Sequence, residues 1–111
     1  MNNIISLLDA LIPLTQNDKI FWKKDENGNG SYRLLTPSFI ISFSIVSTSF
    51  SKEICMKIFD EDGKEICAYE NDDYNLKYVI EHLGDEIQNQ QKRAIDNSIE
   101  KLKKEIMQIS Q

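Results

Sequence analysis

Apolar and polar residues alternate through the middle of the chain with the two-residue period of β-strands. The clearest case is Phe39–Val46, where one face carries the bulkier residues Phe39, Ile41, Phe43 and Ile45. This face is expected to pack on the core. Two strands are predicted before it, at Lys19–Lys24 and Ser31–Leu35, separated by a loop at Asp25–Gly30 that is rich in glycine and asparagine.

The N-terminal residues have the three-to-four-residue spacing of a helix. Apolar side chains recur on one face of the segment 2–14, with polar residues on the other face. Pro13 biases the preceding residue away from helical geometry, so the helix is expected to end there.

The C-terminal third is predicted to be helical throughout. Asn71–Asp73 resembles a helix start, with acids at the positive end of the helix dipole. An apolar stripe follows over Leu76–Ile87, and then Gln88–Arg93 contains no apolar residue. The pattern therefore fits one long helix from about 73 to 109, or two helices broken near 84–92.

Between these regions, Lys52–Glu70 predicts a β-hairpin whose register is chosen by burial. Pairing Ile58 with Ile66 and Met56 with Ala68 gathers the apolar residues on one face. This pairing leaves a three-residue loop, Glu61-Asp62-Gly63, with Gly63 in the left-handed region.

The same register places Cys67 opposite Lys57 and Cys55 opposite Tyr69. The cysteines are then diagonal neighbours on the second face rather than an opposed pair. A disulfide between them is not expected, and their spacing matches no zinc motif.

Together the elements predict an α+β fold with an N-terminal helix, an antiparallel meander of four or five strands, and a long C-terminal helix. The length indicates a single domain over 1–111, in which 92–111 is a candidate projecting arm. The segments T-x3-KIFW, G-x-YRL and FDEDGKEI, followed by a helical C-terminus, resemble small bacterial proteins of similar length. These have no established activity, so the resemblance implies the fold and no chemistry.

The charge balance narrows the classes of partner. The chain carries a net charge of −5, which argues against nucleic-acid binding because phosphate contacts need clustered bases. No apolar run is long enough to cross a membrane. The first residues lack the basic segment of a signal peptide, so we expect a cytoplasmic protein with reduced cysteines.

The acids concentrate between Asp60 and Asp73, where seven acids and one base account for the whole negative balance. Turn formation and helix capping explain most of them individually. Their sum offers an alternative function, an immunity- or antitoxin-type inhibitor of a basic partner protein. The contact residues would be Asp60, Glu61, Asp62 and Glu65.

Candidate chemistry is sparse. Asp25–Gly30 matches the first half of an EF-hand loop, but Thr36 stands where a bidentate Glu is needed and the flanks are strand-like. His82 is the only histidine, with no nucleophile indicated beside it. No catalytic residue, cofactor or metal site is therefore predicted, and we expect the protein not to be an enzyme.

The last helix carries the best interaction candidate. Its apolar residues are spaced 4, 3, 4 and 3 apart, the pattern of coiled-coil core positions, at Ile95, Ile99, Leu102, Ile106 and Ile109. Such a stripe must pack on the protein's own sheet or on a second copy. The leading hypothesis is a non-enzymatic interaction protein that forms a homo-oligomer through this helix.

Overall fold

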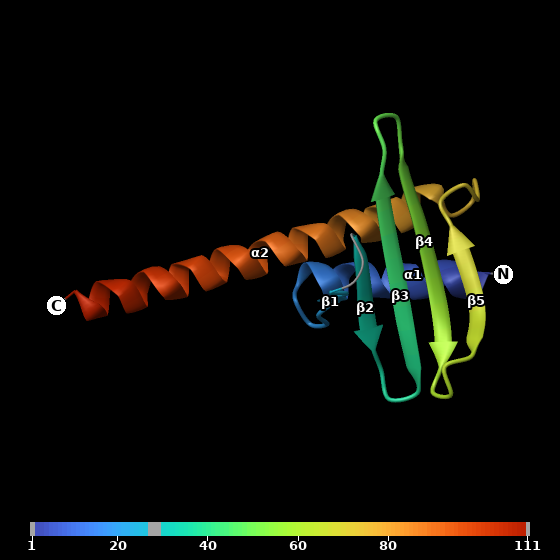
Figure 1. Cartoon of the computed structure of the whole chain (residues 1–111). Coiled ribbons are helices and arrows are strands. Elements are labelled where there is room, and N and C mark those ends of the chain that lie inside the picture. Colours follow the sequence, from blue (N-terminus) through green and yellow to red (C-terminus); the bar gives the residue numbers. More distant parts are fainter. Residues whose placement is uncertain (1, 27–29, 111) are drawn as a thin grey trace.

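The computed structural model describes residues 2–26 and 30–110. It has an α+β fold in which one helix precedes and one helix follows a five-stranded antiparallel meander along the chain (Figure 1). The elements are α1 (Asn2–Gln16), β1 (Lys23–Lys24), β2 (Ser31–Leu35), β3 (Phe39–Ser47), β4 (Lys52–Asp60), β5 (Glu65–Glu70) and α2 (Lys77–Ile109). The predicted fold class is confirmed.

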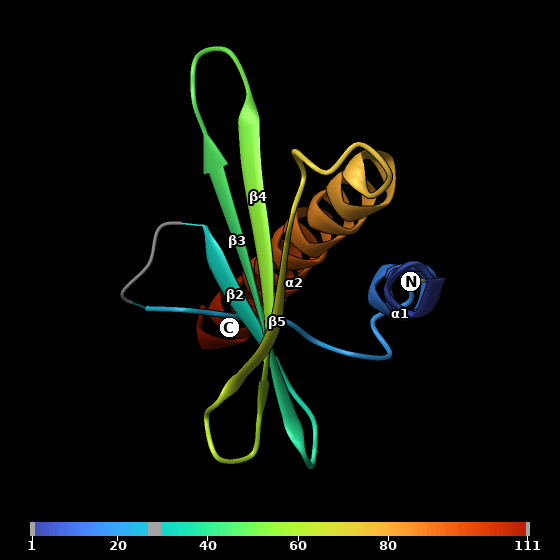
Figure 2. The same cartoon turned by 90° about the vertical axis from the view of Figure 1, so that its right-hand side faces the viewer.

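Both helices lie on the same side of the sheet, and α2 lies closer to it than α1 (Figure 2). The core is formed where the sheet, α2 and α1 meet. Its fully buried members are Leu8, Trp22, Phe43, Met56, Ile80, Leu83 and Ile87. The C-terminal part of α2 runs past the β1 edge of the sheet and away from the rest of the molecule (Figure 1).

The first helix does not end at Pro13, as the sequence predicted, but continues to Gln16. Proline removes only one helical hydrogen bond there, and its ring lies on the exposed side. The last turn is closed by other groups, because the Thr15 hydroxyl donates to the Leu11 carbonyl at 2.7 Å. The Asn17 backbone and side-chain amides both donate to the Pro13 carbonyl.

The predicted strand at Lys19–Lys24 is also largely wrong, because only Lys23 and Lys24 pair with β2. The residues before them form an irregular connector. Trp22 bonds through its backbone to side chains of α2 instead of to a strand. Tertiary hydrogen bonds have replaced the ladder that the aromatic and lysine alternation indicated.

The central strands follow the prediction closely. Ser31–Leu35 is β2, and β3 extends the predicted strand by one residue to Ser47. Ile41, Phe43 and Ile45 are buried on the core face, whereas Phe39, at the strand end, is half exposed. The loop at Asp25–Gly30 joins β1 to β2, but its residues 27–29 lie outside the described part of the chain.

The β4–β5 hairpin closes as predicted and then departs from the predicted register. Gly63 has φ +82°, and Phe59 lies opposite Glu65. A bulge follows, so Ile58 pairs with Cys67 and not with Ile66. Ile66 is the extra residue, and 53% of it is exposed.

The bulge changes which residues of β5 face the core. Tyr69 takes the place opposite Met56 that the sequence assigned to Ala68, and it packs against the core. Cys67 joins Tyr69 on the core side, whereas Cys55, opposite Glu70, points to the other side. The cysteines therefore lie on opposite faces of the sheet, which corrects their predicted placement on one face.

The second helix begins at Lys77, later than Asn71–Asp73 predicted, and no side chain of the described residues caps its N-terminus. The expected capping side chains are used elsewhere. The Asn71 amide bonds to Lys52 and Ile54 of β4, and the Asp73 carboxylate accepts from the Asn75 backbone. From Lys77 the helix is unbroken to Ile109, so the one-helix alternative is correct.

Candidate self-association surface

The C-terminal half of α2 carries an exposed apolar stripe. Every residue from Ile95 to Ser110 is solvent-exposed. The five apolar residues of the predicted stripe keep between 54% and 83% of their surface accessible: Ile95, Ile99, Leu102, Ile106 and Ile109. We call residues 95–110 the arm. Its stripe is a continuous apolar surface of the kind that marks interaction sites.

The N-terminal part of the stripe borders a shallow groove. Apolar and small side chains and one glutamine line this groove at the root of the arm: Gln91, Ala94, Ile95, Ser98, Ile99 and Leu102. Because Ala94 and Ser98 are small, a side chain from another helix could enter between the larger residues.

Charged residues flank the stripe on one side. With Ile99 and Ile106 at coiled-coil position a, Asp96 and Lys103 occupy successive e positions. Neither residue forms an ion pair among the residues that the structure describes. Both charges are thus exposed beside the apolar surface and available to another chain.

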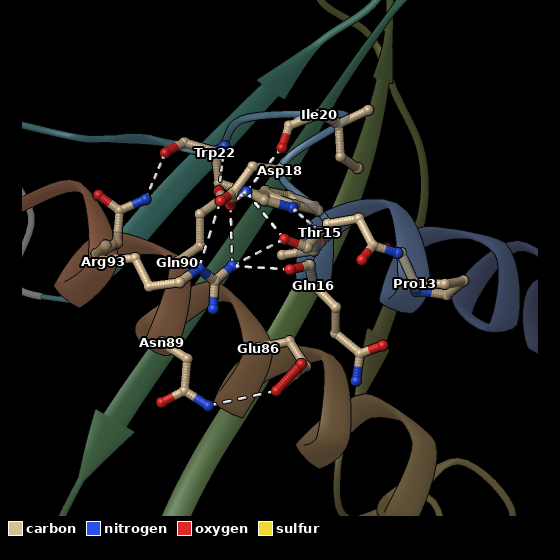
Figure 3. A network of polar contacts seen from close by, with 12 residues as sticks. Pro13, Thr15, Gln16, Asp18, Ile20, Trp22, Glu86, Asn89, Gln90 and Arg93 are labelled. Carbon is tan, nitrogen blue, oxygen red and sulfur yellow. Dashed lines mark hydrogen bonds and ion pairs between the residues drawn. The ribbon is translucent and has the colours of Figure 1, made fainter. Parts of the chain in front are cut away.

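A buried polar network holds the helix at the root of the arm (Figure 3). Gln90 is 1% exposed, and its side-chain oxygen accepts a hydrogen bond from the Trp22 backbone at 3.0 Å. Its side-chain nitrogen donates to the Ile20 and Thr15 carbonyls and to Asp18. Gln90 thus satisfies backbone groups of the connector that no strand pairs.

Two neighbours of Gln90 extend this network, and we call Gln90, Gln91 and Arg93 together the clamp. Gln91 donates to the Trp22 carbonyl at 2.6 Å. Arg93 forms an ion pair with Asp18 at 2.9 Å and donates to the Thr15 and Gln16 carbonyls at the end of α1. The hydrogen bond from Arg93 lowers the pKa of Asp18.

Trp22 joins the clamp to the core. Its indole nitrogen donates to the Thr15 hydroxyl at 3.0 Å, and its ring meets Phe43 edge-on with centroids 6.0 Å apart. The arm therefore leaves the body from a base held by packing and by hydrogen bonds to α1 and to the connector.

The stripe lies on the same side of α2 as Gly84, where the sheet covers the N-terminal half of the helix. A methyl group on Gly84 would lie 3.3 Å from side-chain atoms of Ile54 and Phe43, so this part of α2 faces β3 and β4 directly. Gly84, Gln91 and Ile95 follow at intervals of seven and four residues, which places them on one helical face. The same face is covered by the protein's own sheet near Gly84 and uncovered along the arm.

The acidic tract is divided by the fold. Asp60–Glu65 lies at the β4–β5 turn, and Glu70–Asp73 lies at the opposite end of β5 (Figure 1). The six residues of β5 separate them by about 20 Å. The two halves therefore form separate clusters at opposite ends of the sheet.

Structural contacts occupy part of the predicted acidic contact surface. The Asp60 carboxylate accepts from the backbone amides of Asp62 and Lys64 within the turn. Glu65 is 3.6 Å from Lys57. Glu61 and Asp62 remain exposed at the turn.

The other candidate residues are not brought together. His82 is exposed on α2, and burial raises the pKa of the Cys55 thiol, which makes it a weaker nucleophile. Within residues 2–26 and 30–110, no group of three or more potential ligands could hold a metal ion. The partial match of Asp25–Gly30 to a calcium-binding loop includes Asn27 and Asn29, which lie outside the described residues.

The sequence identified the stripe but missed the clamp. From the sequence, Gln88–Arg93 was noted only as a stretch without apolar residues, whereas in the structure Gln90 and Gln91 bind the connector and Arg93 binds the end of α1. The only signal was that polar residues continue the spacing of the buried stripe, since Ile80, Leu83, Ile87 and Gln90 are 3, 4 and 3 residues apart.

Comparisons with protein-family models, with curated proteins and with solved structures found no match. Among the described residues, no helix combines the length and the apolar character needed to cross a membrane.

Proposed function

We propose that this is a non-enzymatic interaction protein that associates with a second copy of itself through the stripe of the arm. The supporting observation is the exposure of five large apolar side chains on a helix whose base is firmly held. Because an Ile or Leu side chain gains about 1.5–3 kcal/mol on full burial, leaving five half exposed is costly in water.

The spacing of the stripe supports a second copy as the partner. Residues spaced 4 and 3 apart fit between equivalent residues of another helix with the same spacing. The arm is thus complementary to itself. Its unbroken helix of about two heptads is short, so the association should be weak and concentration-dependent.

This function is favoured over inhibition of a basic partner. The stripe is one continuous surface, whereas the acidic tract is divided between two ends of β5 and partly engaged in the turn. We also propose a reducing, cytoplasmic setting, which the free thiols of Cys55 and Cys67 support.

The test is the mass in solution of the full chain as a function of concentration. A rise from the 12.9 kDa monomer toward twice that mass is expected in the micromolar range. A Leu102→Asp variant should remain monomeric, whereas Lys104→Asp, on the opposite face of the arm, should behave as the unmodified protein does.

A further inference from the structure

The direction in which two arms can pair is constrained by the fold. In a parallel pair, both bodies lie at the same end, and the two helices meet along the face that each sheet covers near Gly84. Coiled-coil helices lie only about 8–10 Å apart, which leaves no room for two sheets between them. An antiparallel pair places the bodies at opposite ends, so the two arms can meet without bringing the two sheets together.

The flanking charges indicate the same direction. In an antiparallel pair, the e flank of one helix lies beside the e flank of the other. Asp96 and Lys103, both at e, are then brought opposite each other across the interface. In a parallel pair the e residues would instead meet the g residues Gln91, Ser98 and Glu105, and no pair of opposite charges results.

The register also follows from charge. When Ile99 lies opposite Leu102 of the second copy, Asp96 lies beside Lys103 of the second copy, and symmetry repeats this pair. Shifting by one heptad, so that Leu102 lies opposite Ile106, would place Lys103 against Lys103 and Glu105 against Glu105. Like charges in those positions disfavour the shifted register.

We propose that two copies pair through antiparallel arms, with Ile99 opposite Leu102 and Asp96 beside Lys103 of the second copy. This inference rests on the proposed function and adds the orientation and register of the partner. The partner's helix then ends level with Lys92, within one turn of Ile95, where the unbroken run of exposed residues begins.

Charge reversal in separate chains tests the orientation. Asp96→Lys places a lysine beside the native Lys103 at both ends of the pair, and Lys103→Asp places an aspartate beside the native Asp96 at both ends. Each variant alone should therefore self-associate at least about tenfold more weakly than the unmodified protein. An equimolar mixture of the two variants should restore association. In the mixed pair, the introduced lysine of one chain faces the introduced aspartate of the other, and the remaining native Asp96 faces the remaining native Lys103.

The control variants carry the same charge changes on the outer side of the arm. Glu100→Lys and Lys104→Asp, alone or mixed, should associate as the unmodified protein does. Sedimentation equilibrium gives the dissociation constant in each case, and circular dichroism checks that α2 remains helical.

The outcomes separate the two proposals. Weak single variants with recovery on mixing support the antiparallel register. If the unmodified protein dimerises but mixing restores nothing, the antiparallel register is overturned while self-association stands. If the unmodified protein stays monomeric at several hundred micromolar, both proposals fail.

Discussion

The side-chain oxygen of Gln90 accepts a hydrogen bond from the Trp22 backbone at 3.0 Å, across 68 residues of sequence. This contact ties the connector after α1 to the helix that becomes the arm. Trp22 is fully buried and Gln90 is 1% exposed, so neither group has water as an alternative partner. The base of the arm is therefore part of the folded core.

Replacing Gln90 by Ala should destabilise the fold. The Trp22 amide would lose a buried hydrogen bond and the Ile20 carbonyl a partly buried one, at a cost of about 2–4 kcal/mol in unfolding free energy. Urea denaturation measures the change. Asn89→Ala is the matched control, because Asn89 is exposed and its side chain donates to the neighbouring Glu86 at 3.3 Å, and it should cost less than about 0.5 kcal/mol. Equal effects from the two variants would contradict the assigned role of Gln90.

Asp18 should make the unfolding free energy depend on pH in the acidic range. In the folded state, the hydrogen bond from Arg93 holds the pKa of Asp18 below its ordinary value of 3.8, so the ionised form favours folding. This contribution is fully present above the ordinary value and is lost as the pH falls through the lowered pKa. Urea unfolding at a series of pH values should show the unmodified protein more stable than Asp18→Asn at pH 6. The difference should shrink below about pH 4, and a difference that grows there would refute the pairing.

Two glycines with positive φ should respond differently to alanine. Gly30 and Gly63 have φ of +76° and +82°. Both substitutions carry backbone strain of about 1 kcal/mol, since L-residues disfavour this region. At Gly30 the added methyl group would also collide with the Ile45 carbonyl oxygen, whereas at Gly63 it meets nothing within 4 Å. Thermal unfolding should therefore show a clearly lower midpoint for Gly30→Ala than for Gly63→Ala. Equal midpoints would contradict the close approach of Gly30 to β3.

Sequence patterns predicted the parts of the fold in which periodicity and burial agree. In β3 the alternation of Phe43 and Ile45 with smaller residues matches the observed core face. In the β4–β5 hairpin the turn chemistry gave the loop correctly. The bulge at Ile66 then shifted the register, and a bulge leaves no mark in an alternating pattern.

The errors elsewhere arose where long-range contacts replaced local preferences. Pro13 was expected to end α1, but the Thr15 hydroxyl closes the last turn and is itself held by Trp22. The connector before β1 resembled a strand, but its backbone groups bond to α2. Partners of this kind, such as Gln90 and Ile20, 70 residues apart, cannot be found from spacing.

The candidate surface was more predictable than its base. The exposed stripe follows directly from the 4-3-4-3 spacing, because a regular helix converts spacing into a face. The sequence did not indicate which side of α2 the sheet would cover. That relation, through Gly84 and Gln91, emerged only from the fold, and the orientation proposed for the arms depends on it.

The stripe can be tested without disturbing the core. Leu102 is 55% exposed, so Leu102→Asp should change the unfolding free energy of the single chain by less than about 1 kcal/mol while abolishing association. Circular dichroism and urea unfolding at low micromolar concentration check the fold, and sedimentation checks association. A Leu102→Asp variant that dimerises normally would place the interface elsewhere.

Sedimentation equilibrium of the unmodified full chain, from about one to several hundred micromolar, tests the central claim most directly. Self-association through the arm predicts a mass that rises with concentration from 12.9 kDa toward twice that value. A mass that stays at 12.9 kDa over the whole range would contradict it.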